Sequence, residues 1–108
     1  MERPGLRVDG RDVSDEQYHV THNPAAGRFE IRTESGTALL HYAHAGEDLD
    51  LLHTEVPDAL EGKGYGSALV RAALDYARRE RIRVIPTCPF VADYIARHPE
   101  DATLVAHD

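Results

Sequence analysis

Cysteine, positive charge and long apolar runs are all scarce in this chain of 108 residues. The one cysteine, Cys88, cannot form a disulfide within the chain, which predicts a reduced, intracellular protein. No apolar run approaches the roughly 20 residues that span a bilayer. Residues 1–5 also lack the apolar stretch of a signal peptide. We therefore expect a cytoplasmic protein that does not bind or cross a membrane.

The shortage of positive charge narrows the possible partners. Twelve basic residues stand against nineteen acidic ones, a net charge of −7, which argues against nucleic-acid binding through phosphates. Residues 1–60 carry five basic and twelve acidic side chains, whereas residues 63–83 carry six basic and two acidic ones. This local basic excess is compatible with a small anionic ligand, although helical arginines are also common on a solvated face.

The length predicts one folded domain, and the order of the predicted strands and helices gives it an α+β fold. Residues 1–16 are polar and contain Pro4, Gly5 and Gly10, so they are predicted to be a tail, with a short edge strand near residues 6–8. Residues 17–108 form the single domain. Strands are predicted over residues 18–22, 28–32, 37–43 and 49–56, separated by short turns and closed by Pro57. They predict an antiparallel meander.

After Pro57 the apolar period changes from two to about 3.6. Apolar residues from Tyr65 to Ala77 recur at spacings of three and four, which predicts a helix. A short strand over residues 82–86 follows, parallel to strand 49–56. Pro89 suits a first helical position, which makes Cys88 the N-cap of a helix that ends before Pro99. Residues 103–106 are expected to form a last short strand. The fold is a mixed sheet in which the meander leads into a strand, glycine turn, helix, strand and helix.

The glycine-rich turn over residues 61–67 lies between a strand and a helix. Its glycines let the backbone approach a ligand closely, and the helix start attracts an anion such as phosphate. Lys63, the only lysine, lies in this turn. The chain has no Gly-Lys-Ser/Thr triplet of a Walker loop and no acidic residue in strand 82–85 for a dinucleotide fold. The pyrophosphate of coenzyme A is the remaining common ligand, and a plain flexible loop is the alternative.

The ordered set of motifs resembles the GNAT superfamily of acetyl-CoA-dependent N-acyltransferases, and in particular its small single-domain branch. The likeness extends from about residue 19 to residue 100. It is carried by Arg28-Phe29-Glu30, His53-Thr54-Glu55-Val56-Pro57, Glu61-Gly62-Lys63-Gly64-Tyr65-Gly66-Ser67-Ala68-Leu69-Val70, Val84-Ile85-Pro86-Thr87-Cys88-Pro89-Phe90-Val91 and His98-Pro99-Glu100.

This resemblance implies acetyl-CoA as the cofactor. The pantetheine arm would lie between strands 49–56 and 82–86, against backbone groups near Thr54, Glu55 and Val56. The pyrophosphate would sit on Gly62, Lys63, Gly64, Tyr65, Gly66 and Ser67. Arg71 is a further candidate for the phosphates. Glu61 stands where the wider superfamily usually has Gln or Arg, and the two helices that frame the acceptor in larger members are missing. We expect valine at Gly64 or Gly66 to block binding through positive φ and bulk.

Transfer to an amine needs a base and an acid. His53 and Glu55 lie two residues apart on one strand and share a face, so either is a candidate base. The resemblance makes Tyr94 a candidate near the coenzyme sulfur. A helix N-cap favours the thiolate of Cys88, which is a candidate proton donor, acetyl carrier or redox-sensitive thiol. A small apolar packing role is the alternative.

Other features are less informative. His19 and His22, like His41 and His44, are three residues apart and point to opposite faces of a strand, so no metal site is expected. The acidic first half is compatible with a cationic acceptor such as a lysine side chain or a polyamine. Two other functions stay open, namely a catalytically weak acyl-CoA-binding or sensing domain, and an interaction module that pairs through the edge of the meander.

Overall fold

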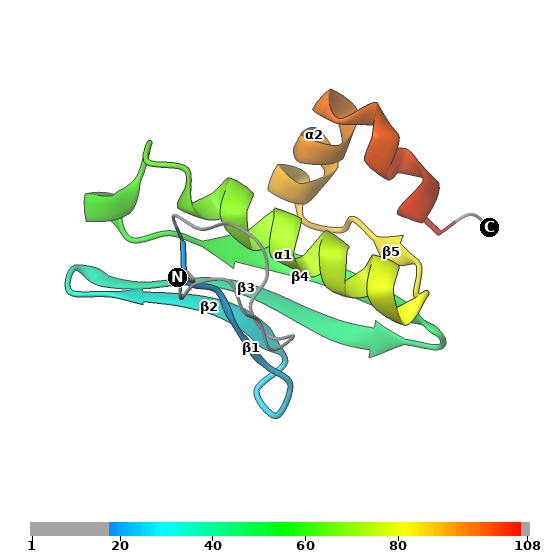
Figure 1. Cartoon of the computed structure of the whole chain (residues 1–108), viewed down its shortest axis with the longest axis horizontal. Coiled ribbons are helices and arrows are strands. Elements are labelled where there is room, and N and C mark those ends of the chain that lie inside the picture. The colour runs from blue at the N-terminus through cyan, green and yellow to red at the C-terminus, as the bar shows by residue number, and fades with distance from the viewer. Residues whose placement is uncertain (1–17, 107–108) are drawn as a thin grey trace, which may run out of the picture.

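The computed structural model describes residues 18–106, which form a five-stranded sheet with helices (Figure 1). The spatial order β1-β2-β3-β4-β5 follows the chain. Neighbouring strands are antiparallel except β4 and β5, which are parallel, so the predicted meander and crossover are confirmed. The tail predicted for residues 1–16 lies outside the described residues. The strands are β1 (Thr21–Asn23), β2 (Arg28–Thr33), β3 (Gly36–Ala45), β4 (Asp48–Glu55) and β5 (Val84–Ile85).

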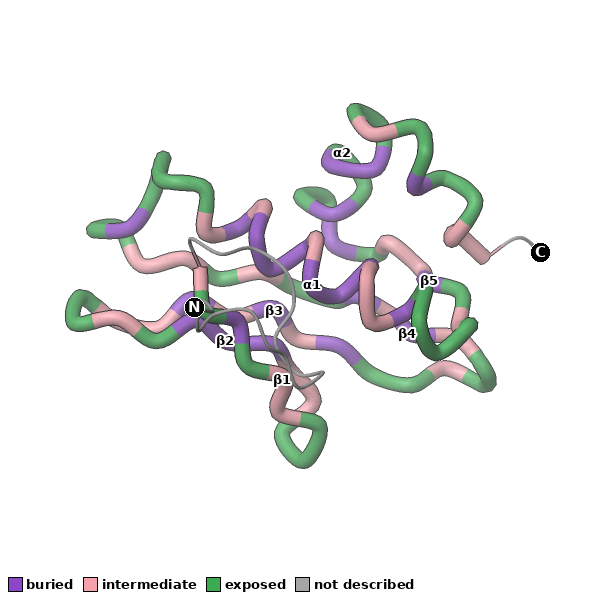
Figure 2. Tube along the Cα trace, viewed as in Figure 1, coloured by how far each residue is buried: buried purple, intermediate pink, exposed green. Residues whose placement is uncertain are grey.

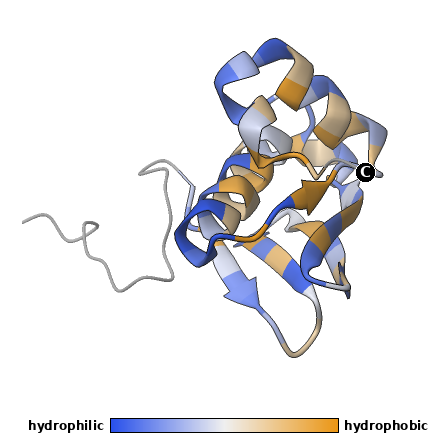
Figure 3. Cartoon of the chain, turned by 90° about the vertical axis from the view of Figure 1, so that its right-hand side faces the viewer, coloured by the Kyte–Doolittle hydropathy of each residue, from blue (hydrophilic) through white to orange (hydrophobic). Residues whose placement is uncertain are grey.

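Helix α1 (Tyr65–Glu80) packs across one face of the sheet. Leu69, Ala72, Ala73 and Ala77 of the predicted stripe are fully buried, and the three small alanines let the helix lie close to the strands. Tyr65 and Tyr76 are only half-buried, whereas Ala68, Val70 and Leu74 outside the stripe are buried as well. On the sheet side, Phe29, Leu40 and other alternate residues of the strands complete the core. Figure 2 shows these buried positions between the two layers, and Figure 3 shows hydrophobic and hydrophilic residues alternating along the strands. The alternation is the period of two expected for a sheet with one covered face.

The chain after β5 runs back over α1. Helix α2 (Pro89–Arg97) has Cys88 as its N-cap and Pro89 in its first turn, as predicted. The strand expected over residues 103–106 is confirmed only in part, because η3 (Pro99–Leu104) is a 3-10 helix and pairing with β5 begins at Val105. Buried Asp101 holds this turn to α1 by accepting a 2.7 Å hydrogen bond from Arg78. Val105 then makes an isolated bridge to Val84. No helix within residues 18–106 is long and apolar enough to cross a membrane.

A register shift interrupts the pairing of β3 with β4. His41 pairs with His53, but Tyr42 pairs with Leu51, so Leu52 has no partner on β3. The extra residue leaves Leu51 in the core and Leu52 38% exposed. A bulge of this kind increases the local twist of the strand. The last residues of β4 are therefore turned relative to its first half.

A polar aromatic cluster closes the far end of the core. The His22 ring stacks on Phe29, with centroids 4.3 Å apart, and its Nε2 lies 2.6 Å from the hydroxyl of Tyr42. Burial, together with the positive charge of Arg79 and the nearby His44, lowers the pKa of His22 below its ordinary value of 6.5. The imidazole is therefore neutral in the folded protein at neutral pH.

The adjacent leucines of the bulge give a matched pair for stability. Leu51→Ala removes a side chain that is 0% exposed and leaves a cavity, so we expect the free energy of unfolding to fall by about 2–5 kcal/mol. Leu52→Ala should change it by less than about 1 kcal/mol. Urea denaturation measures both. Similar losses in the two variants would contradict the alternation described for β4.

The neutral His22 predicts a pH-dependent stability. Its pKa is lower in the folded than in the unfolded chain, so the unfolded chain binds more protons below about pH 6.5. The free energy of unfolding should therefore fall as pH drops through this value. His22→Gln should flatten that fall, whereas His19→Gln at an exposed position should keep it. Urea denaturation between pH 7.5 and 5, values chosen to bracket the ordinary imidazole range of about 6.5, provides the test. An unchanged slope in His22→Gln would refute the assignment.

Candidate active site

Strands β4 and β5 separate after a short stretch of pairing. Within residues 18–106, the pairing between β4 and β5 is limited to Leu49 and Asp50 on the β4 side. Pro86 comes next and has no N–H with which to continue the ladder. One further backbone hydrogen bond, from the Cys88 N–H to the Leu51 carbonyl at 2.9 Å, ties the start of α2 to β4. Beyond Leu51 the β5 side of β4 has no strand partner in the described part of the chain.

The glycine-rich turn faces this open edge. Gly64 is the N-cap of α1 and has a φ of +87°, a left-handed conformation that glycine takes without strain. The amides of Tyr65, Gly66 and Ser67 precede the first helical hydrogen bond, in which the Ala68 N–H donates to the Gly64 carbonyl at 3.0 Å. These N–H groups and the positive end of the helix dipole favour an anion at the turn.

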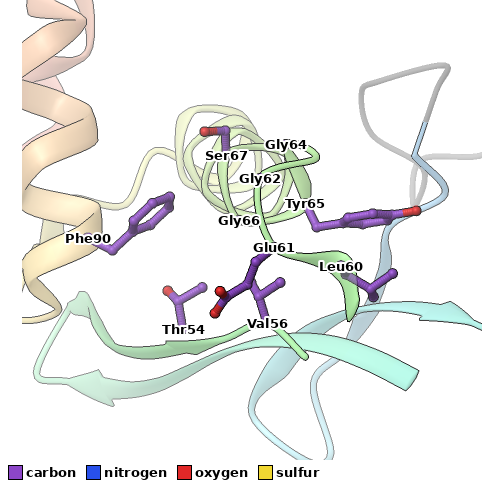
Figure 4. Close-up of a pocket in the computed structure, with 10 residues that line it drawn as sticks. All are labelled: Thr54, Val56, Leu60, Glu61, Gly62, Gly64, Tyr65, Gly66, Ser67 and Phe90. Carbon is purple, nitrogen blue, oxygen red and sulfur yellow. The ribbon is translucent and has the colours of Figure 1, made fainter. Parts of the chain in front are cut away.

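A cavity of about 460 Å³ lies between the open edge and the turn (Figure 4). The end of β4 forms one wall, the turn and the start of α1 form the opposite wall, and α2 contributes one ring. The lining residues are Thr54, Val56, Leu60, Glu61, Gly62, Gly64, Tyr65, Gly66, Ser67 and Phe90. Seven of the residues that were expected to bind the coenzyme thus line one cavity, whereas Glu55, Lys63 and Arg71 do not.

Lys63 is one of the residues that do not join them. It is exposed, it is absent from the lining, and its carbonyl accepts a 2.5 Å hydrogen bond from the hydroxyl of Tyr18. Glu61 does line the cavity, and Figure 4 shows its carboxylate directed toward the β4 wall. An anion at the turn would therefore meet backbone amides, with an acidic side chain nearby.

Gly66 is needed for a different reason from the one expected. It lies inside α1 without a positive φ, and a Cβ there would come within 3.0–3.1 Å of the Phe90 ring. The ring occupies the space that a larger side chain would fill. Phe90 was not singled out from the sequence, although its place directly after Pro89 put it at the start of α2.

Cys88 lies behind the cavity wall. Its side chain is buried, with the residue 4% exposed, and its sulfur is 3.5 Å from the Thr54 hydroxyl, which does line the cavity. The thiol makes no standard capping hydrogen bond to α2. Burial raises the pKa of Cys88, but the Thr54 hydroxyl and the backbone N–H groups of Val91, Phe90 and Thr54 outweigh it and lower the pKa from 9.0.

The three other catalytic candidates occupy two separate places. His53 Nε2 lies 3.2 Å from a carboxylate oxygen of Glu55, so the two share a face as their spacing predicts. Both alternate with the cavity-lining Thr54 and therefore point to the other side of β4. Tyr94 is buried, stacks on His98 at 4.0 Å and does not line the cavity. Burial raises the pKa of Tyr94, and a hydrogen bond with Arg71 opposes this rise.

Within residues 18–106 no group of three or more His, Cys, Asp or Glu side chains is arranged to hold a metal ion. The groups around the cavity are backbone amides, the Thr54 hydroxyl with the Cys88 thiol behind it, the Glu61 carboxylate, and the imidazole and carboxylate of His53 and Glu55 across the strand. Such groups can bind an anion and exchange protons.

Comparison with known proteins gives a family match and several similar relatives. Residues 28–104 match the GCN5-related N-acetyl-transferase family. Protein NATD1 of Xenopus tropicalis is 33% identical over 95 residues, which cover 85% of this chain and 86% of the relative. Protein NATD1 of Homo sapiens is 35% identical over 83 residues, which cover 74% of each chain.

A solved structure has the same fold. The solution structure of a GCN5-like protein from Staphylococcus aureus superposes with a TM-score of 0.67 at 20% sequence identity. The superposition covers 84% of this chain and 90% of that one. At this identity the likeness concerns the fold alone.

Proposed function

We propose that this chain, which belongs to the GCN5-related N-acetyltransferase family, transfers an acetyl group from acetyl-CoA to an amine. Membership supports acyl transfer in general. The observation that carries the finer proposal is the cavity between an unpaired strand edge and a helix N-terminus. An extended pantetheine arm can add to the edge as a further strand would, while a pyrophosphate meets the helix amides.

The residues around the cavity fit this cofactor with one exception. The backbone of Thr54 and Val56 would hold the arm, and the amides of Tyr65, Gly66 and Ser67 would hold the pyrophosphate. Glu61 is the exception, because its carboxylate and a phosphate repel each other at short distance. The pyrophosphate should therefore lie toward α1 and away from Glu61.

Acetyl-CoA, when bound, supplies a thioester carbonyl that an amine nitrogen can attack. A carbon–nitrogen bond would form as the carbon–sulfur bond breaks, and the second proton that the nitrogen loses would balance the proton that the leaving thiolate takes up. An alkylamine arrives as an ammonium ion, so one proton must be removed before attack. His53 and Glu55 are solvent-accessible, in contact with each other and across one strand from the cavity, and we assign them this removal.

The burial of Cys88 selects among its three possible roles. A thiol that is absent from the cavity lining cannot readily form an acetyl thioester or a mixed disulfide with the coenzyme. It can pass a proton to the Thr54 hydroxyl at 3.5 Å, which in turn faces the cavity. We therefore assign Cys88 as the acid that reprotonates the departing thiolate through Thr54, and its lowered pKa suits a proton donor.

Coenzyme binding tests the site. At a CoA concentration about 100-fold above Kd, binding should raise the Tm of the wild-type protein by roughly 10–20 °C. Gly64→Val should abolish the rise, because valine cannot take its φ and would crowd the turn. Gly46→Val is the matched control, since Gly46 also has a positive φ but lies in the β3–β4 turn. Gly46→Val should lower the Tm of the free protein but keep the rise in Tm on CoA binding.

The same samples separate the possible functions. Release of free thiol from acetyl-CoA in the presence of an amine supports the transferase. Binding of CoA without any thiol release would instead indicate an acyl-CoA-binding or sensing domain. An equal rise in Tm for Gly64→Val and the wild-type protein would place the coenzyme elsewhere.

The contact between Thr54 and Cys88 predicts that the pKa of Cys88 depends on the Thr54 hydroxyl. Thr54→Val should raise the pKa of Cys88, because it removes the hydroxyl that stabilises the thiolate. Thr87→Val should leave this pKa unchanged, since that hydroxyl bonds to Asp50 instead. Ultraviolet absorbance of the thiolate against pH measures both.

Turnover supplies the second readout for this pair. Cys88→Ala should lower kcat by up to about 100-fold with little change in the KM for acetyl-CoA, as expected for a lost proton donor, and Cys88→Ser should lie between. Full activity in Cys88→Ala would assign the thiol to packing alone.

A further inference from the structure

Tyr18, which precedes β1, contacts the glycine-rich turn although the two are 45 residues apart in the sequence. Its hydroxyl donates a 2.5 Å hydrogen bond to the Lys63 carbonyl. Its ring packs edge-on against the ring of Tyr65, with centroids 5.0 Å apart and an angle of 75° between the planes. Tyr18 is half-buried and packs against the hydrophobic core. The contact thus ties the turn to the body of the domain.

Tyr18 holds the turn from outside the cavity. Gly62, Gly64 and Tyr65 line the cavity, whereas Tyr18 and Lys63 do not. Figure 4 shows the Tyr65 ring extending from the start of α1 to the chain segment that precedes β1. The turn therefore lies between the cavity and Tyr18, and a ligand in the cavity does not need to touch this tyrosine.

The hydrogen bond from Tyr18 fixes the orientation of one peptide group in the turn. The Lys63 carbonyl and the Gly64 N–H belong to the same peptide group, and none of the described peptide bonds is cis. In a trans peptide these two bonds point in opposite directions. The carbonyl points to Tyr18, so the Gly64 N–H points away from it. Because glycine permits several backbone conformations at low cost, this peptide needs an outside partner to keep one orientation.

The fit between Tyr18 and Gly64 is close. A Cβ built at Gly64 would lie 2.5 Å from the Tyr18 hydroxyl oxygen and 3.4 Å from the Cζ atom of the ring. The first distance is too short for a real contact, whereas the second is an ordinary one. Gly46 and Gly62 also have positive φ, yet a Cβ on either would meet nothing within 4 Å. Gly64 is therefore required both by its φ and by the Tyr18 hydroxyl.

We propose that Tyr18 is a positioning residue for the phosphates of the coenzyme. Its hydroxyl holds the Lys63–Gly64 peptide, so that the Gly64 N–H joins the N–H groups at the start of α1 that meet an anion. The inference rests on the proposed binding of CoA at this turn, and it adds a residue from outside the turn to that site. A peptide that is already oriented loses less freedom when the phosphate binds, which strengthens binding.

Calorimetric titration of the full chain with CoA and with pantetheine tests the proposal. Pantetheine has the same arm as the coenzyme but no phosphate. Tyr18→Phe removes the hydroxyl and keeps the ring. It should raise the Kd for CoA by about 3- to 10-fold, the range for one lost hydrogen bond between neutral groups, and leave the Kd for pantetheine unchanged.

Tyr42→Phe is the matched control. It also removes a hydroxyl, one that lies 2.6 Å from His22 Nε2 at the far end of the core. It should lower the Tm of the free protein and leave the Kd values of both ligands unchanged. If Tyr18 only stabilised the fold, Tyr18→Phe would behave as Tyr42→Phe does, or it would weaken CoA and pantetheine together.

A double-mutant cycle tests the close fit by a readout that needs no ligand. Gly64→Ala should lower the Tm of the wild-type protein more than that of Tyr18→Phe, because the hydroxyl that the new methyl group would meet is missing from the second protein. The cost of the positive φ is the same in both and cancels. Equal losses of Tm would show that the hydroxyl does not hold the turn, and would overturn the proposal.

Failure of this inference is distinguishable from failure of the proposed function. If the wild-type protein binds CoA and Tyr18→Phe binds it equally well, or loses CoA and pantetheine alike, the role of Tyr18 is wrong while the coenzyme site stands. Absence of any CoA-induced rise in Tm for the wild-type protein would remove the proposed function, and this inference with it.

Discussion

The loss of pairing between β4 and β5 is the constraint on which the rest of the site depends. Two residue pairs and one backbone hydrogen bond to Leu51 hold the strands together, and Pro86 prevents more. A longer β5 would form hydrogen bonds with the backbone N–H and C=O groups along this edge of β4. Because it stops, the backbone around Thr54 keeps its hydrogen-bonding capacity on that edge. The turn at Gly64 and the start of α2 lie beside this edge and complete the cavity.

Much of this arrangement follows from local sequence rules. The alternation in β2 and the four- and three-residue spacing in α1 each reflect a buried face, so they predict the elements well. The error at residues 103–106 has a long-range cause. Asp101 is held by Arg78, some twenty residues earlier, and no local pattern reveals that contact. The same limit applies to Phe90, whose place beside Gly66 depends on how α2 packs against α1.

For the site residues too, features set by local sequence could be predicted, whereas contacts between distant elements could not. The conformation of the glycine turn is predictable from the sequence because its backbone requirements are local. Gly64 does adopt the left-handed conformation. The role of Lys63 stays a prediction, because charge and sequence position do not fix where a long side chain points and its exposed side chain does not line the cavity. The distance from Cys88 to Thr54 joins two elements that are 34 residues apart. Only the fold shows that the hydroxyl, and not the sulfur, forms the cavity wall.

Side-chain alternation along β4 places unlike chemistry on the two faces of this strand. Thr54 lines the cavity on the α1 side, where helix amides face the turn, whereas His53 and Glu55 point to the opposite face. Residues 33–62, which include β3 and β4, contain no lysine or arginine, so neither strand brings such a positive charge to that face. The proposed coenzyme and its amine acceptor would therefore meet different charges on the two sides of a single strand.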